Sequence, residues 1–244
     1  MMQQQQRPTN SRNQITLRGS TKIIVEFFEY CINSLLFQRG LYAPEYFKMT
    51  KKYGLNMLVT NDPEVKSHMR EILKQVEAWL MACKVEKLIL AIKSKETMTV
   101  LERWQFDIHN TKDQSSTFST STKTTNTDSF SRPLAGAGQD TSTTAPSLSS
   151  PSKPKPEKTE KEIQTEIQAI LRQITASVSF LPMLDEKCTW TILCQTEKDA
   201  EVPATWSDAD PHLVHNAEQV KLRSFSTNLH KIDALVAYRL NDDL

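Results

Sequence analysis

The sequence predicts an α+β fold in which three helices pack against a mainly antiparallel sheet. Three segments have the 3.6-residue periodicity of helices, and they lie at 20–38, 62–83 and 159–178. The remaining apolar runs are short or alternating, as in strands, and the polar turn SKET at 94–97 joins two of them as a hairpin. Helices segregated against an antiparallel sheet are typical of the α+β class.

The N-terminal part is predicted to contain a short strand, a buried helix and a hairpin. Residues 15–18 have strand character, and the helix at 20–38 is apolar around most of its circumference, which places it in the middle of a core. Ser20 is the expected N-cap of this helix, and Gly40 is its expected C-terminal stop. Residues 47–60 follow as a hairpin or two strand fragments.

The second and third helices have clear start signals. Asp62 followed by Pro63 is a capping residue with proline in the first turn. Thr159 with Glu162 three residues later has the pattern of a capping box. Each helix carries a single apolar stripe, and the stripe of the third is expected to continue to Val178.

The predicted sheet is built from KLILAI, LERWQFDI, CTWTILCQ and two C-terminal runs, QVKLRSFST and KIDALVAYRL. In LERWQFDI, at 101–108, Trp104, Phe106 and Ile108 share one face. Residues 198–216 are polar and irregular. Trp206 lies there between two prolines, and an aromatic residue in such a loop is expected to anchor it.

A polar block at about 111–157 interrupts this pattern. Of its 47 residues, 21 are Ser or Thr and only seven are apolar, so it cannot bury a core and is expected to be disordered. Residues 1–12 are expected to be a flexible tail. We therefore predict a single domain over 13–244 with an insertion inside it.

Composition excludes several functions. Gly19, Gly40 and Gly54 are too far apart for a dinucleotide-binding loop or a P-loop. The 30 basic and 29 acidic residues give no basic face, so a nucleic-acid partner is not expected. No apolar stretch approaches the roughly 20 residues that span a bilayer. The start MMQQQQRPTN lacks the apolar core of a signal peptide, so we expect an intracellular protein with reduced cysteines.

No metal or cofactor site is expected. Cys188 and Cys194 lack a second pair of ligands, and His212 and His215 lie in a polar loop without matching cysteines.

Catalysis is not expected either. His230 and Asp233 form the only local cluster with a nearby serine, yet on a strand they point to opposite faces. They are expected to be polar groups on a sheet edge, and the chain is expected not to be an enzyme.

Several of these segments together resemble the HORMA domain family, in the branch that contains the spindle-checkpoint proteins. The segments that carry the resemblance are ITLRGS at 15–20, FF…INSLLFQRGLY at 27–42, KYGL at 52–55, LERWQFD at 101–107, RQITASVSFLP at 172–182, VPATW at 202–206 and VKLRSFST…HKIDALVAY at 220–238. They keep their order over most of the chain.

The resemblance implies peptide binding by strand addition. A short peptide of a partner would join the edge strand through Thr189, Trp190, Thr191, Ile192 and Leu193. The C-terminal segment, residues 198–244, would close over it as a "safety belt". This belt would have an open position, covering the peptide edge, and a closed position on the other side of the sheet.

The same resemblance assigns roles to single residues. Trp206 would anchor the belt, and Arg223, Phe225, His230 and Tyr238 would belong to it, the last three lying near the peptide. Arg172, Gln173 and Phe180 would form the surface on which an open copy docks on a closed copy. Residues 15–18 would be a strand released on closure, so Leu17 would be buried only in the open form.

The resemblance also implies partners and location. The partners would be the checkpoint scaffold Mad-one, Cdc-twenty (the activator of the anaphase-promoting complex), a BubR-one-type kinase or its Mad-three counterpart, and an AAA+ ATPase with a HORMA-like adaptor. The protein would delay anaphase and would occur in nucleus, kinetochore and cytoplasm. The alternatives are another HORMA branch, a translesion polymerase subunit or a meiotic axis protein, and an enzyme using His230 and Asp233.

Overall fold

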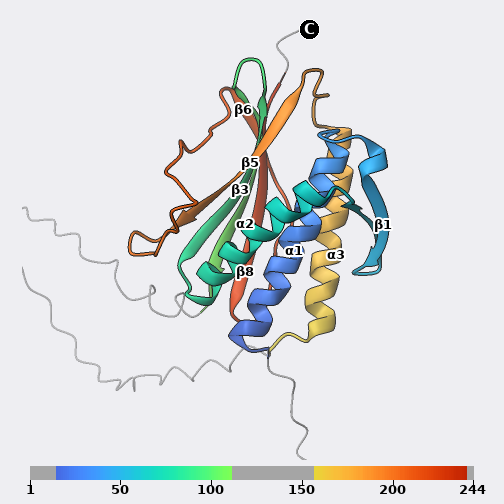
Figure 1. Ribbon diagram of the computed structural model, residues 1–244. Helices are drawn as coiled ribbons and strands as arrows, with labels where there is room; N and C mark the ends of the chain where they lie inside the picture. The colour runs from blue at the N-terminus through green and yellow to red at the C-terminus, as the bar shows by residue number, and fades with distance from the viewer. Residues whose placement is uncertain (1–14, 112–156, 241–244) are drawn as a thin grey trace, which may run out of the picture.

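Three helices cover one face of a six-stranded sheet in the computed structural model, which describes residues 15–111 and 157–240 (Figure 1). The tail at 1–12 and nearly all of the block at 111–157 lie outside the described residues. The sheet has the order β5-β3-β4-β8-β6, and the short β7 also pairs with β8. All its strand pairs are antiparallel, and the predicted α+β class is confirmed.

Helix α1, Leu17–Gln38, begins one turn earlier than predicted. Thr16 has extended backbone, and its hydroxyl accepts a hydrogen bond from the Gly19 amide at 3.1 Å, so Thr16 is the N-cap and Ser20 lies inside the helix. The strand expected at 15–18 is absent, because the edge of β4 is occupied by β8. Gly40, at φ +63°, ends the helix as predicted.

A 3₁₀ turn, Pro44–Tyr46, leads into the hairpin of β1, Phe47–Lys52, and β2, Leu55–Thr60. Tyr53 and Gly54 form its turn with φ of 51° and 68°, the left-handed pair that a two-residue hairpin loop requires. The Gln168 side chain of α3 donates to the Tyr53 carbonyl at 2.8 Å, so this turn is held against the third helix.

Helices α2, Pro63–Met81, and α3, Glu160–Ala176, begin as predicted. The Asp62 carboxylate accepts from two first-turn amides, and Thr159 and Glu162 form the full capping box. Val178 is an exception to the predicted stripe, because α3 ends at Ala176 and a 3₁₀ turn, Ser177–Ser179, leaves Val178 exposed.

Strands β3, Val85–Ser94, and β4, Val100–Asn110, form the centre of the sheet. Trp104, Phe106 and Ile108 are buried on the face toward the helices, as the alternation predicts. β5, Cys188–Thr196, pairs with β3 and ends the sheet on that side.

The C-terminal strands are β6, Ala217–Lys221, β7, Phe225–Ser226, and β8, His230–Arg239. The run predicted as one strand, QVKLRSFST, is therefore two short ones. β8 lies between β4 and β6, with Trp104 opposite Val236. The C-terminal strands thus lie on the side of the sheet far from β5.

Within the part of the chain that the structure describes, no helix has the length and apolarity to span a bilayer. The same part holds no cluster of three His, Cys, Asp or Glu side chains suited to a metal ion.

Candidate binding site at the free sheet edge

β5 has one unpaired edge. Its inner edge is hydrogen-bonded along β3, from Cys188 opposite Ser94 to Thr196 opposite Val85, and no strand of the described residues joins the outer edge. Ile192 is buried beneath the strand, and the other side chains at 189–193 are half-buried. An exposed strand edge offers a row of N–H and C=O groups to an incoming extended chain.

Trp190 fixes β5 against the helix layer. Its indole N–H donates to the Tyr42 hydroxyl at 2.9 Å, and its ring centroid lies 5.6 Å from that of His68 on α2. These contacts hold the strand in place while its outer edge stays unpaired, so the edge is a preformed template.

The segment that follows β5, residues 197–216, is tied first to the end of α2. The Glu197 amide donates to the Lys84 carbonyl at 2.9 Å, and the Glu201 carbonyl accepts from the Trp79 indole at 2.9 Å. The Trp206 ring packs edge-to-face on Trp79, with centroids 4.9 Å apart. The expected anchoring role of Trp206 in this loop therefore corresponds to a definite contact.

The same segment then reaches the face of the sheet that lies away from the helices (Figure 1). The Arg103 side chain of β4 donates to the Pro211 carbonyl at 3.2 Å, and the His212 ring lies 3.3 Å from the Lys93 ammonium of β3. Burial and the nearby Lys93 charge lower the pKa of His212, so its ring stays neutral beside this lysine. Residues 207–210 thus pass from one layer to the other on the β5 side of the sheet.

The three residues predicted to lie near the peptide lie on β7 and β8. Phe225, His230 and Tyr238 are all buried at β7 and β8, and β4 and β3 separate them from β5. The Phe225 ring packs on Phe27 of α1, with centroids 4.7 Å apart. The physical reason is the pairing of β8 with β4, which turns the inward side chains of β7 and β8 toward the helices. Arg223 is exposed in the loop between β6 and β7.

His230 is not the sheet-edge group that the sequence suggested. Its Nδ1 lies 2.7 Å from the Ser20 hydroxyl, which is also 2.7 Å from the Thr227 hydroxyl. All three side chains are buried, and desolvation lowers the pKa of His230. Asp233 lies on the opposite face, as predicted, where it contacts Lys231 at 2.7 Å. The two residues cannot act together on a substrate.

The C-terminal end of α3 is partly exposed. The Arg172 side chain points to solvent and Phe180 is 42% exposed, its ring 6.0 Å from that of Tyr238. Gln173 is half-buried, and its side-chain oxygen accepts from the Arg223 amide at 2.6 Å. The structure therefore brings Gln173 and Arg223 together, although they were predicted to serve different surfaces.

Glu166 of α3 and Lys158, which precedes α3, make two further contacts that the sequence did not predict. The Glu166 carboxylate accepts from the Ser226 amide at 3.0 Å, and the Lys158 ammonium donates to the Ser226 hydroxyl at 2.7 Å. No local pattern marks these residues, because their partners lie about 60 positions away in the chain. Leu17 is half-buried in the first turn of α1.

Comparison with known proteins now identifies the fold family. The HORMA domain model matches residues 20–230. The chain belongs to the HORMA domain family. It is 45% identical to the mitotic spindle checkpoint component mad2 of Schizosaccharomyces pombe, over 94% of this chain and 97% of that protein. It is 41% identical to the human mitotic spindle assembly checkpoint protein MAD2A, over 94% and 96% of the two chains.

Solved structures agree with this assignment. A chain in the crystal structure of a mitotic checkpoint complex has a TM-score of 0.71 and 43% identity, and the match covers 91% of this chain and 99% of that one. Nematode HTP-2 bound to an HTP-3 motif has a TM-score of 0.64 at 9% identity, which shows the shared fold alone. By its relatives, this HORMA protein is a spindle assembly checkpoint protein and not an enzyme.

Proposed function

We propose that this HORMA protein binds a short extended peptide of Mad-one or Cdc-twenty on the outer edge of β5, beneath residues 197–216, and so delays anaphase. The observation that carries the proposal is the combination of an unpaired β5 edge with a following segment anchored on both layers of the domain. Main-chain hydrogen bonds to β5 would supply affinity, and the side chains at 189–193 would supply specificity.

The anchors of this segment suggest how a bound peptide is retained. The Trp79–Trp206 pair holds it on the helix layer, and the Arg103 contact with Pro211 holds it on the opposite face. A peptide on β5 would lie inside the loop of chain between these points. Its release then requires the segment to detach, which favours slow dissociation over weak, fast exchange.

The proposed cycle has two arrangements of the C-terminal strands. β8 beside β4 is the position that the proposal assigns to the closed form, and in the open form the strands would cover β5 instead. Alternation in β8 supports such a change, because Ile232, Ala234 and Val236 give it one apolar face that can pack on either side of the sheet. Closure would also release residues 15–18 from strand pairing.

The remaining partners follow from the same proposal. An open copy would dock on a closed copy through Arg172, Gln173 and Phe180. A BubR-one-type kinase or its Mad-three counterpart would join the inhibitory complex, and an AAA+ ATPase with a HORMA-like adaptor would restore the open form through the N-terminal tail.

We place the protein in nucleus, kinetochore and cytoplasm, and we regard 13–244 as one domain with an insertion at about 111–157.

Hydrogen exchange of the full chain tests the binding mode. A synthetic Cdc-twenty peptide should slow exchange of the amides at 188–196, because half of them point to the outer edge and gain partners there. The β1–β2 hairpin serves as the internal control and should not change. Unchanged exchange of β5 at saturating peptide would contradict the proposal. Protection of β5 by a polymerase-subunit or meiotic-axis peptide alone would favour the other HORMA branch.

A further inference from the structure

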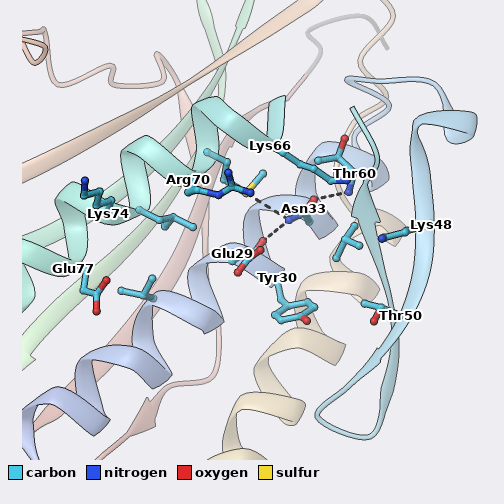
Figure 2. Close-up of a pocket in the computed structure, with 14 residues that line it drawn as sticks. Glu29, Tyr30, Asn33, Lys48, Thr50, Thr60, Lys66, Arg70, Lys74 and Glu77 are labelled. Atoms are coloured by element: carbon cyan, nitrogen blue, oxygen red, sulfur yellow. Dashed lines mark hydrogen bonds between the residues drawn. The ribbon is translucent and has the colours of Figure 1, made fainter. Parts of the chain in front are cut away.

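A groove lies between α1, α2 and the β1–β2 hairpin, on the helix layer and away from β5 (Figure 2). It has a volume of about 700 Å³, within the usual range of ligand sites, and is partly open to solvent. Nothing in the proposed peptide binding or dimerisation uses its residues.

The floor of the groove is apolar and rigid. Met69 and Leu73 of α2 are buried there, beside Val25 of α1 and Val59 of β2. Buried Asn33 joins the three elements at one end. Its amide nitrogen donates to the Glu29 carbonyl at 2.8 Å and its oxygen accepts from the Thr60 amide at 2.8 Å. The floor is therefore preformed and would not need to order on binding.

The walls carry basic side chains that are not held in ion pairs among the described residues. Lys66, Arg70 and Lys74 are spaced four residues apart, so they form one ridge of α2, and Figure 2 shows Lys48 of β1 across the groove from this ridge. None of these four cations makes an ion pair within 4 Å among the described residues, whereas Lys52, Lys84, Lys158 and Lys231 all do. The ridge thus presents cations without acidic partners.

Glu29 and Glu77 also line the groove, so its charge is mixed, with four cations and two carboxylates. This pattern disfavours a nucleic-acid backbone, whose closely spaced phosphates would meet both carboxylates and leave the apolar floor unused. An extended peptide with alternating acidic and apolar residues fits better, because its two sets of side chains separate toward the ridge and the floor.

We propose that this groove binds an acidic linear peptide of a partner protein, with carboxylates toward Lys66, Arg70 and Lys74 and apolar side chains on Met69, Leu73 and Val59. No residue of β5 or of 197–216 lines the groove, so the two sites could be occupied together. The groove would then join a second protein to the checkpoint complex independently of peptide closure.

Fluorescence anisotropy with a defined probe tests this. The probe is a fluorescein-labelled twelve-residue peptide of alternating glutamate and leucine, and the comparison peptide has lysine in place of glutamate. The full chain should bind the acidic probe only. The double variant Lys66→Glu, Arg70→Glu should bind it at least about tenfold more weakly. The matched control is Lys161→Glu, which reverses an exposed charge on α3 and should leave the affinity unchanged.

Thermal unfolding of each variant checks that the fold is intact. The proposal is overturned if wild type and double variant bind the acidic probe equally, or if wild type does not bind it. It is also overturned if a labelled DNA duplex binds with the same sensitivity to the double variant while the acidic peptide does not. Amide shifts of wild type with the acidic probe should be largest around Asn33, Val59 and Leu73, and shifts confined to other elements would contradict the assigned location.

Discussion

Ser20→Ala should destabilise the arrangement in which β8 lies beside β4. The Ser20 hydroxyl lies within hydrogen-bond distance of Nδ1 of the His230 ring, and both side chains are buried, with 0% and 1% exposure. In this variant the Thr227 hydroxyl also loses its contact with Ser20, but it keeps a hydrogen bond from the His230 amide at 2.9 Å. Leaving one buried ring nitrogen without a partner costs about 1–3 kcal/mol. The expected shift in the folding equilibrium is thus roughly 5- to 150-fold.

Urea unfolding of the full chain at pH 7.5 measures this directly. The midpoint should fall by an amount corresponding to about 1–3 kcal/mol, with little change in slope, because the surface exposed on unfolding is nearly the same. Ion-exchange profiles add a second readout. If the network exists only when β8 is beside β4, the variant should also lose population of that form.

The matched control is Ser67→Ala, which removes an exposed hydroxyl on α2 and should change stability by less than about 0.5 kcal/mol. A double-mutant cycle with His230→Leu isolates the pair, and the double variant should be less destabilised than the sum of the single variants. If Ser20→Ala lost no more stability than Ser67→Ala, the buried network would not hold the C-terminal strands, and the reasoning would be refuted.

Four other predictions follow from the same structure. Burial lowers the pKa of His230, so the folded chain binds a proton on this ring less tightly than the unfolded chain does. The contribution of His230 to the free energy of unfolding is therefore full above about pH 6.5 and decreases as the pH falls toward the folded pKa. Urea titrations should show a flatter pH dependence of the unfolding free energy in His230→Leu than in wild type. Arg172→Glu should abolish open–closed dimerisation and leave peptide binding intact, and a dimer that persists in light scattering would contradict this. Leu17→Ala should favour the closed form by roughly 1 kcal/mol, since Leu17 is only half-buried here, and equal ion-exchange fractions in mutant and wild type would refute it. Trp206→Ala should speed release of bound peptide roughly twofold to tenfold by removing the ring contact with Trp79, with an unchanged dissociation rate as the contrary result.

Local signals predicted the helices and strands well where the deciding contacts are themselves local. Asp62 and Thr159 cap their helices through amides two or three residues away, so a single sequence contains all the needed information. Alternation in β4 likewise gave the buried face, because one side of the sheet meets three helices.

The start of α1 could not be predicted from local signals alone. Thr16 and Ser20 are both good capping residues, and the sequence alone favoured Ser20. The structure uses Ser20 instead to bind His230, which is 210 residues away, and leaves the cap to Thr16. The strand expected at 15–18 is absent for another long-range reason, because β8 occupies the edge of β4. The position of β8 could not be predicted because its apolar face suits either side of the sheet.

In the proposed cycle, α3 is the element that distinguishes the two positions of the C-terminal strands. Gln173 and Glu166 accept hydrogen bonds from the Arg223 and Ser226 amides, and these bonds exist only while this segment lies along α3. Two such bonds contribute about 1–3 kcal/mol together, comparable with the roughly 1.5–3 kcal/mol from burying Phe225 beside them. Burial is non-directional, whereas the two acceptors fix the register of the loop next to Arg172. A docking copy that contacts the end of α3 therefore meets a surface whose backbone geometry depends on where β8 is paired.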